Sequence, residues 1–499
     1  MKNIINNDNL RELKSKDSNS IDLILTDIPY GLDDVDALDL IQNNTKNNTK
    51  GFMGKAWDCL PTIDTLTEFN RVLKEGGWFI TTFIPRQDLQ TVLYYRLLEA
   101  GFDISFSPIY HTFASGFPKA NNISKKLDKK AGTEREVVGY TTQGAKSIFD
   151  GGKERPTTLP TTLPTTLPTT PEAKYCDGLY GEFQPKPAVE IVVIAQKKYK
   201  SNSQIDHALN WYNERRELLE KGITEEELSL HTKLASGGTW FDEVRIPCAN
   251  EKTPKGSGNA NKGNTWSVTV KGNGGNITPE QGRYPANLLV SDDCLDVGRE
   301  SKSIASFNYE ISTKDEWIFD IKTKHKRVSP HADKGDLSRF FSKESWVKKH
   351  LPEFYKLSSK TLQLEKDAEK IYPFLSVSKA SVAEKNVGLD EFESKNKWGK
   401  GGSGVGITER SNTIQQNTHV TAKNITLFAY LLKLFSKEND VVLDPYCGSG
   451  TTLIACELTN RHYIGIELEK EYYDIALARV EYWKNQKEEW EQYEDGKLL

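Results

Sequence analysis

A glycine-rich turn between an apolar segment and a helical segment constrains this chain most. The letters VVLDPYCGSGTT begin at Val441, and the apolar residues before Asp444 predict a buried strand. Gly448 and Gly450 allow the backbone to approach a ligand closely where the following helix begins. The pattern therefore predicts an α/β domain with a ligand at the end of this strand.

The residues around the turn indicate which ligand it accepts. No lysine follows the final glycine, which excludes a phosphate-binding loop, and Leu453 stands where a dinucleotide turn needs glycine. Asp444 would repel phosphate but suits a sulfonium group. Glu467, which ends the next predicted strand YIGIE, suits two ribose hydroxyls. S-adenosylmethionine has both groups and no phosphate, and it is the predicted cofactor.

The composition excludes several classes of protein. The chain has 499 residues, 37% of them hydrophobic and 27% charged, which is typical of a polar globular protein with more than one domain. No apolar run is long enough for a membrane span, and the amino terminus lacks a signal-peptide core. The six cysteines show neither CxxC nor metal-ligand spacing. We expect a cytoplasmic protein without a metal.

Both ends of the chain have the pattern of βα units. Residues 1–200 alternate apolar runs with amphipathic stretches, and two expected helices end at Gly76 and Gly101. Residues 416–485 return to this order, and residues 486–499 predict a charged helical tail. The two ends are therefore candidates for one α/β domain.

The interior of the chain differs from both ends. Residues 155–171 repeat Thr-Thr-Leu-Pro, and proline at every fourth position predicts an exposed, extended loop. Residues 201–415 mix helical segments with glycine- and asparagine-rich tracts that cannot bury a core. We interpret this second region as an insertion that serves another domain.

A second strand end raises a chemical question. In LILTDIPYG, which begins at Leu23, Pro29 cannot continue a central strand. A carboxylate, Asp27, and an aromatic ring, Tyr30, therefore stand together just past the end of a hydrophobic strand.

The two strand ends are expected to meet. Ligands of open α/β sheets bind outside the carboxyl ends of the strands. We therefore expect the strand at residues 441–443 to lie beside the strand at residues 21–25, with Asp444 and Asp27 at one edge of the sheet.

These motifs resemble those of a known family. DIPY is similar to the catalytic (D/N/S)PP(Y/F) motif of amino-group DNA methyltransferases, and DPYCGSGTT is similar to their cofactor motif. The catalytic motif comes first and a long variable region follows, which is the order of the β class. FMGKAWD, GFPKANNISKKLDK and GRYPANLL resemble a phage-associated branch.

The resemblance implies a Rossmann-like, S-adenosylmethionine-dependent methyltransferase sheet assembled from both chain ends, with residues 201–415 as a target recognition region. It implies catalytic roles for Asp27, Ile28, Pro29 and Tyr30. It implies cofactor contacts from Asp8, Lys423, Asp444, Tyr446, Gly448, Gly450, Thr451 and Glu467, and no metal. Lys423 lies in NTHVTAKN, which resembles the HPTxKP element of the family with both prolines replaced.

The implied chemistry explains the acid and the ring. An exocyclic amine is a poor nucleophile because its lone pair is delocalised into the base. Hydrogen bonds to the Asp27 carboxylate and the Ile28 carbonyl would favour a localised lone pair, and a bound sulfonium then makes attack a matter of positioning. Ile28 replaces the usual proline, but the acceptor there is a carbonyl. The base must be flipped out of the duplex, and Tyr30 would stack on it.

A basic stretch is the candidate contact with DNA. Lys119–Lys130 carries five lysines and one aspartate, which a solvated helix face would also explain. The resemblance favours contact with phosphates through Lys119, Lys125, Lys126 and Lys129.

We interpret the chain as a site-specific methyltransferase for the N6 amine of adenine in double-stranded DNA, because Asp rather than Ser heads its catalytic motif. Methylation of the cytosine N4 amine, a structured RNA substrate and a catalytically weak DNA-binding relative are the alternatives. A homodimer and an associated restriction nuclease stay open as partners.

Overall fold

The computed structural model describes both chain ends and a smaller part of the interior. The described residues are 2–31, 36–44, 57–112, 121–143, 161–181, 189–245, 287–290, 382–393, 414–419 and 422–494. Short strands are also described at 301–302, 306–310, 324–328, 334–335, 375–376 and 395–396.

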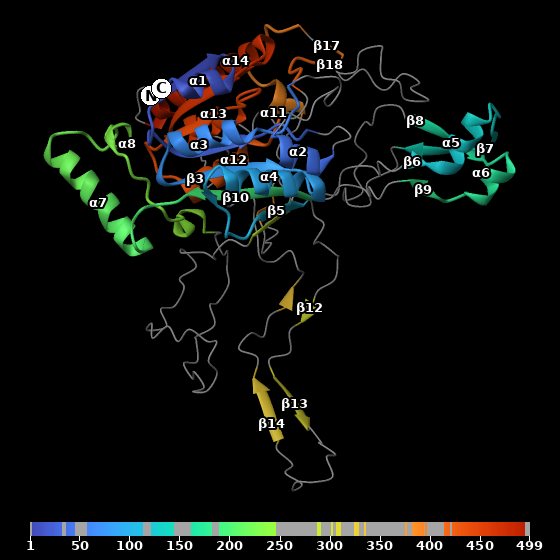
Figure 1. The fold of residues 1–499 in the computed structure, drawn as a ribbon, viewed down its shortest axis with the longest axis horizontal. Helices are drawn as coiled ribbons and strands as arrows, with labels where there is room; N and C mark the ends of the chain where they lie inside the picture. The colour runs from blue at the N-terminus through green and yellow to red at the C-terminus, as the bar shows by residue number, and fades with distance from the viewer. Residues whose placement is uncertain are drawn as a thin grey trace.

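One mixed sheet of ten strands organises this part of the chain (Figure 1). Its order is β1-β20-β19-β2-β3-β10-β5-β11-β16, and β4 pairs with β10. The strands are β1 (Lys2–Asn6), β2 (Ile21–Asp27), β3 (Leu73–Phe83), β4 (Phe102–Asp103), β5 (Ile109–Thr112), β10 (Val189–Lys197), β11 (Leu288–Val290), β16 (Leu375–Ser376), β19 (Val441–Asp444) and β20 (His462–Glu467). Pairing is parallel from β1 to β3, whereas β10 is antiparallel to β3 and β5.

The two chain ends meet in the middle of this sheet. β19 pairs in parallel with β2, with Val442 opposite Leu23 and Leu443 opposite Ile24. The predicted α/β sheet built from both ends is confirmed. Because both strands run in the same direction, Asp27 and Asp444 end them at the same edge.

Helices cover both faces of the sheet. One face packs against α1 (Asn9–Lys14), α2 (Ala37–Asn43), α3 (Ile63–Val72) and α4 (Gln87–Glu99), and the other against α12 (Ile425–Phe435), α13 (Thr451–Leu458) and α14 (Lys470–Glu494). The other described helices near the sheet are α7 (Gln204–Glu220), α8 (Leu228–His231), the 3-10 helix η2 (Phe241–Val244) and α11 (Val382–Asn386). Ile24 belongs to a core with α1 to α4, and Leu23 and Leu25 belong to a core with α12 to α14. Alternate residues of β2 thus point to opposite faces, and the strand is buried on both.

The remaining described elements are small. β6 (Asn121–Asn122), α5 (Ile123–Lys130), β7 (Glu136–Gln143), β8 (Thr161–Leu167), α6 (Pro171–Tyr175) and β9 (Tyr180–Gly181) form a unit that Figure 1 shows to one side of the sheet. Two-stranded ladders join β12 (Ser301–Lys302) with β15 (Lys334–Gly335), β13 (Ser306–Glu310) with β14 (Lys324–Val328), and β17 (Lys395–Asn396) with β18 (Ile414–Gln415).

A buried ion pair fastens the segment around α8 to the sheet. Lys74 Nζ of β3 lies 2.8 Å from both carboxylate oxygens of Asp22 and donates to the Ser229 carbonyl at 2.6 Å. Asp22 also accepts a hydrogen bond from Val441 N at 2.9 Å. One pair of charges therefore connects β2, β3, β19 and α8.

Parts of residues 201–415 belong to the same body as the sheet. β11 and β16 extend the sheet, and the α11 side chain Glu384 accepts a hydrogen bond from Ile425 N at 2.8 Å. The predicted boundary at residue 200 does not separate these elements from the chain ends. The predicted boundary at residue 485 lies inside α14, which continues to Glu494.

Two local predictions need correction. The helix expected to end at Gly76 ends at Val72, because the chain from Leu73 onward forms β3 and pairs with β2; Gly76 has φ +79° within that strand. The helix end at Gly101 is confirmed, since this glycine follows α4 with φ +88°.

The Thr-Thr-Leu-Pro repeat was expected to be a loop, but residues 161–167 form β8, which pairs antiparallel with β7. Proline is compatible with this strand because a two-stranded sheet leaves one edge of each strand without a partner. Pro171 begins α6, where a proline suits the first helical turn. Residues 155–160 lie outside the described part of the chain.

Replacing Asp22 by Asn should destabilise the fold, because the Lys74 ammonium would stay buried without a countercharge. We expect the free energy of unfolding to fall by about 3–5 kcal/mol, measured by urea denaturation. The control is Glu220→Gln, which breaks an exposed ion pair with Arg216. An Asp22→Asn change as small as that of the control would contradict this account of the ion pair.

Candidate active site

A cavity of about 630 Å³ opens at the edge where β2, β19 and β20 end. Its walls come from both chain ends. Of the residues predicted for the site, it is lined by Asp8, Asp27, Ile28, Pro29, Tyr30, Lys423, Asp444, Tyr446, Gly448, Thr451 and Glu467. Gly450 does not line the cavity; it caps the amino terminus of α13 with φ +79°.

The turn after β19 is built for a residue without a side chain. Gly448 has φ +52°, and a Cβ atom there would lie 2.6 Å from His419 Nε2. The Gly448 N–H points instead to Glu467 Oε2 at 2.9 Å. The glycine turn and the acid that ends β20 therefore form one structure.

Glu467 is a buried carboxylate at the wall of the cavity. Its other oxygen accepts a hydrogen bond from Glu469 N at 2.9 Å. Burial raises the pKa of Glu467 to about 7, against the lowering effect of the two backbone donors. The side chain is thus held in a fixed position with its charge sensitive to pH near neutrality.

Asp444 connects the glycine turn after β19 to strand β2. Its carboxylate accepts a hydrogen bond from Thr26 Oγ1 of β2 at 2.6 Å, one from Tyr446 N at 3.1 Å and one from the Thr452 hydroxyl. Burial raises the pKa of Asp444 to about 6, against the lowering effect of these hydrogen bonds. Asp444 therefore holds the turn in shape as well as lining the cavity.

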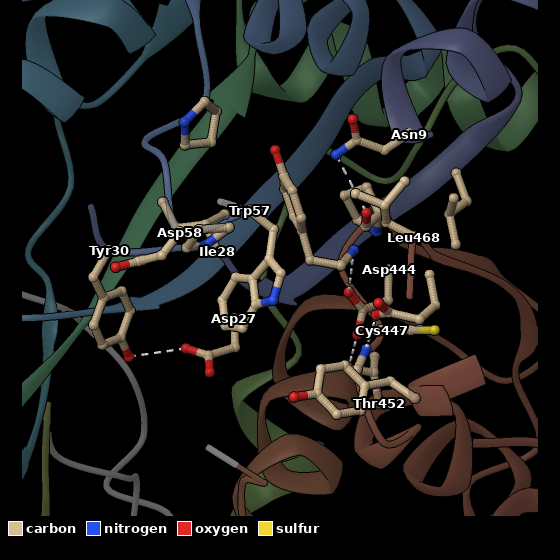
Figure 2. A pocket seen from close by; sticks show the side chains of 18 of the residues that line it. Asn9, Asp27, Ile28, Tyr30, Trp57, Asp58, Asp444, Cys447, Thr452 and Leu468 are labelled. Carbon is tan, nitrogen blue, oxygen red and sulfur yellow. Dashed lines mark hydrogen bonds between the residues drawn. The ribbon is translucent and has the colours of Figure 1, made fainter. Parts of the chain in front are cut away.

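Asp27 is held through one of its two oxygens. Oδ1 accepts hydrogen bonds from the Thr82 hydroxyl and from Tyr30 Oη, the latter at 2.8 Å, and lies 3.4 Å from Lys423 Nζ. Figure 2 shows the Asp27 and Tyr30 side chains facing one another, with Asp444 on the other side of Trp57 in this view. The predicted acid and ring are therefore together at the cavity wall.

The two residues between Asp27 and Tyr30 shape the backbone. Ile28 N donates to Thr81 Oγ1 at 3.3 Å, and the Ile28 side chain is only 1% exposed within the core that contains α1 to α4. Pro29 is also buried, and β2 ends before it. The apolar side chain of Ile28 thus contributes to packing rather than to polar contacts.

Lys423 lies on the catalytic side of the cavity. Its ammonium donates to Glu190 Oε1 at 2.7 Å and to Tyr30 Oη at 2.9 Å, besides its approach to Asp27. Burial would lower the pKa of Lys423, but Asp27 and Glu190 more than reverse this and hold it well above its ordinary value. The lysine is therefore a permanent cation beside the catalytic motif.

Asp8 and Tyr446 also line the cavity. Asp8 caps α1 by accepting a hydrogen bond from Arg11 N at 2.9 Å. The Tyr446 ring packs edge-on against Phe69, with the ring centroids 6.3 Å apart. Thr451 Oγ1 contacts the Lys423 carbonyl at 3.4 Å, which joins the two halves of the wall.

Several lining or supporting residues were not predicted from the sequence, among them Thr82, Glu190, His111 and Trp57. Glu190 stands as a lone acid in the otherwise apolar run AVEIVVIA, which is a signal that the sequence did contain. Trp57 lies in FMGKAWD, which resembles a phage-associated branch of the family, and it lines the cavity. Thr82 and His111 carry no comparable signal.

The basic stretch lies in the small unit around α5. Lys125, Lys126 and Lys129 are exposed on α5, whereas Asp128 is buried and pairs with Arg135 at 2.7 Å. The acid of the stretch is thus turned inward and its positive charges outward. Lys119 lies outside the described residues.

Within the described residues, no helix is long and apolar enough to cross a membrane, and no group of His, Cys, Asp and Glu is arranged to hold a metal ion.

Part of the chain is similar in sequence to type II methyltransferases. The type II methyltransferase M.HindIII of Haemophilus influenzae is 46% identical over 67 residues, which are 13% of this chain and 22% of that protein. M.HinfI of Haemophilus influenzae is 43% identical over 65 residues, 13% of this chain and 18% of that protein. The matched segment thus spans only about a fifth of each relative.

Among solved structures, the cytosine-N4-specific PvuII DNA methyltransferase aligns with 97% of this chain and 90% of its own, at 11% identity and a TM-score of 0.35. The family model described as DNA methylase, which covers N6 and N4 amino-methyltransferases, matches residues 21–478. That family uses S-adenosylmethionine, the predicted cofactor. The match runs from β2 to α14 and includes both motifs at the cavity, and the chain belongs to this DNA methylase family.

Proposed function

We propose that this protein is a site-specific DNA methyltransferase that transfers a methyl group from S-adenosylmethionine to the exocyclic N6 amine of adenine in duplex DNA. The observation that carries the proposal is the position of Asp27, whose carboxylate reaches the cavity that the Gly448 turn and Glu467 also line. The membership of the DNA methylase family supports the reaction class.

The residues present fit the cofactor. A Cβ at Gly448 would meet the His419 ring, so this turn requires glycine, and Gly448 lines the cavity. Glu467 would accept hydrogen bonds from the ribose hydroxyls, Asp444 would face the positive methionine portion, and Asp8 and Tyr446 would line the adenine side. When bound, S-adenosylmethionine supplies a methyl group on a positively charged sulfur.

Asp27 would receive the target amine. Its Oδ1 is engaged by the Thr82 and Tyr30 hydroxyls, and among the described residues no hydrogen bond reaches Oδ2. An ionised carboxylate is acceptor-only, so Oδ2 suits an amine N–H, and the Ile28 carbonyl suits the second N–H. Holding both hydrogens localises the nitrogen lone pair and directs it into the cavity, where attack depends on positioning.

Tyr30 would contact the flipped base. Its hydroxyl is tied to Asp27, and its ring packs edge-on against Phe83 with centroids 5.4 Å apart. Both contacts fix the Tyr30 ring at the wall of the cavity. Stacking on such a ring contributes roughly 1–3 kcal/mol per base, which offsets part of the few kcal/mol needed for flipping.

The product tests the adenine assignment. We expect nucleoside mass spectrometry of treated duplex DNA to find N6-methyladenine, and Asp27→Ala to abolish it because the acceptor for the amine N–H is lost. Asp27→Ala should still bind the cofactor. Methylation only on the cytosine amine would overturn the adenine assignment, and cofactor and DNA binding without any methylation would identify a DNA-binding relative instead.

Glu467→Gln should weaken cofactor binding by roughly 10- to 150-fold, equal to about 1.5–3 kcal/mol for hydrogen bonds to a charged group. The wild-type affinity should also rise with pH through about 7, because the ribose donors favour the ionised form and burial raises the pKa of Glu467 to about 7. Calorimetry at several pH values measures both effects.

The matched control is Asp474→Asn, an acid-to-amide change in the exposed partner of Lys470. It should leave both the affinity and its pH dependence unchanged. An unaltered affinity in Glu467→Gln would remove Glu467 from the site.

The exposed α5 lysines are proposed to contact DNA phosphates without reading sequence. Replacing Lys125, Lys126 and Lys129 by Gln should weaken binding equally for all sequences and reduce the salt slope by about 1 per lost contact. Lys221→Gln with Lys233→Gln, two exposed lysines elsewhere, serves as the control. An unchanged salt slope would show that the α5 lysines form a solvated surface that does not contact DNA.

We further propose residues 201–415 as the region that recognises the target sequence, with a homodimer and an associated restriction nuclease as candidate partners. Methylation-sensitive sequencing of DNA from cells that express the chain identifies the recognition sequence. Sedimentation of the purified protein determines whether it dimerises.

A further inference from the structure

Glu190 contacts residues of the catalytic site but belongs neither to the motif Asp27–Tyr30 nor to the glycine turn after β19. It belongs to β10, where it lies opposite His111 of β5. Its Oε1 accepts from Lys423 Nζ at 2.7 Å and lies 3.4 Å from Tyr30 Oη, and its Oε2 lies 3.8 Å from His111 Nδ1. Glu190 therefore shares two neighbours, Lys423 and Tyr30, with Asp27.

The Lys423 ammonium lies closer to Glu190 than to Asp27. Its Nζ lies 2.7 Å from Glu190 but 3.4 Å from Asp27. At 3.4 Å the ammonium still attracts the Asp27 carboxylate but does not form a close ion pair with it. A close pair would use the lone pairs that the target amine needs.

We propose that Glu190 is a positioning residue that holds the Lys423 ammonium back from Asp27, so that the Asp27 carboxylate remains available to the target amine and to its proton. This inference rests on the proposed methyl transfer. It assigns Lys423 to the catalytic motif rather than to the cofactor.

The step that Asp27 serves can be written out. The amine nitrogen forms a bond to the methyl carbon while the carbon–sulfur bond breaks and the sulfur keeps the electron pair. The nitrogen then carries an extra proton, which passes to Asp27 Oδ2. A carboxylate in a close ion pair would be a poorer acceptor for this proton.

The charges around the cluster agree with this division of roles. Asp27 faces Lys423 and Tyr30, with Glu190 and Asp444 close enough to interact electrostatically. Burial raises the pKa of Asp27, Lys423 lowers it and Glu190 raises it, and the net direction is upward. Burial would also raise the pKa of Glu190, but Lys423 and His111 more than reverse this. Glu190 thus stays charged while Asp27 takes up the proton.

The methylation rate should fall at low pH as Asp27 becomes protonated, and we call this fall the acid limb of the pH–rate profile. Two substitutions should move the acid limb in opposite directions. In Glu190→Gln, Lys423 loses its closer partner and the pKa of Asp27 falls, so the limb should move to lower pH and methyl transfer should slow by about 10- to 100-fold. In Lys423→Met, the nearby cation is lost, so the limb should move to higher pH. Glu190→Asp keeps the charge and should restore part of the rate.

A readout independent of turnover is the titration of the Asp27 carboxyl itself, followed by carbon-13 NMR and assigned by its loss in Asp27→Asn. Its midpoint should fall in Glu190→Gln and rise in Lys423→Met. A midpoint and an acid limb that do not move in Glu190→Gln, or that move as in Lys423→Met, would overturn the proposal. If the wild type does not methylate DNA, the proposed function fails, while the titration still decides the role of Glu190.

Discussion

The pairing of β2 with β19 is the constraint on which the site depends. Thr26 Oγ1 donates to Asp444 Oδ1 at 2.6 Å across this pair, between residues 418 positions apart in the sequence. Parallel strands end at the same edge of a sheet, so the pairing brings Asp27 and the Gly448 turn to one cavity without any further device. A chain in which the two ends folded separately would hold each motif but no site.

The site buries several charged side chains, and each of them has a hydrogen-bond or ion-pair partner. Asp444 and Glu467 accept hydrogen bonds from hydroxyls and backbone N–H groups, and Asp27 and Glu190 share Lys423. A buried charge without such partners would cost several kcal/mol. The same partners fix the orientation of each carboxylate, so the groups that stabilise the charges also organise the site.

The sequence predicted the parts of the fold and the site that local patterns determine. The strands around Leu23 and Val442, their shared edge and the glycine turn follow from hydrophobic runs and turn residues, and the structure contains them. The helix expected to end at Gly76 was wrong because pairing with β2 overrides the local glycine signal. The contact between Lys423 and Glu190 spans 233 residues, and no local pattern encodes it.

The most direct test of the account is a crystal structure of the protein with target duplex DNA and a non-reactive cofactor analogue. We predict a flipped adenine whose N6 lies within about 3 Å of Asp27 Oδ2, the distance of a catalytic hydrogen bond. The analogue should lie over the Gly448 turn with its ribose on Glu467. A target amine bound away from Asp27, or an analogue bound away from the turn, would contradict the claim that the two chain ends build one methyl-transfer site.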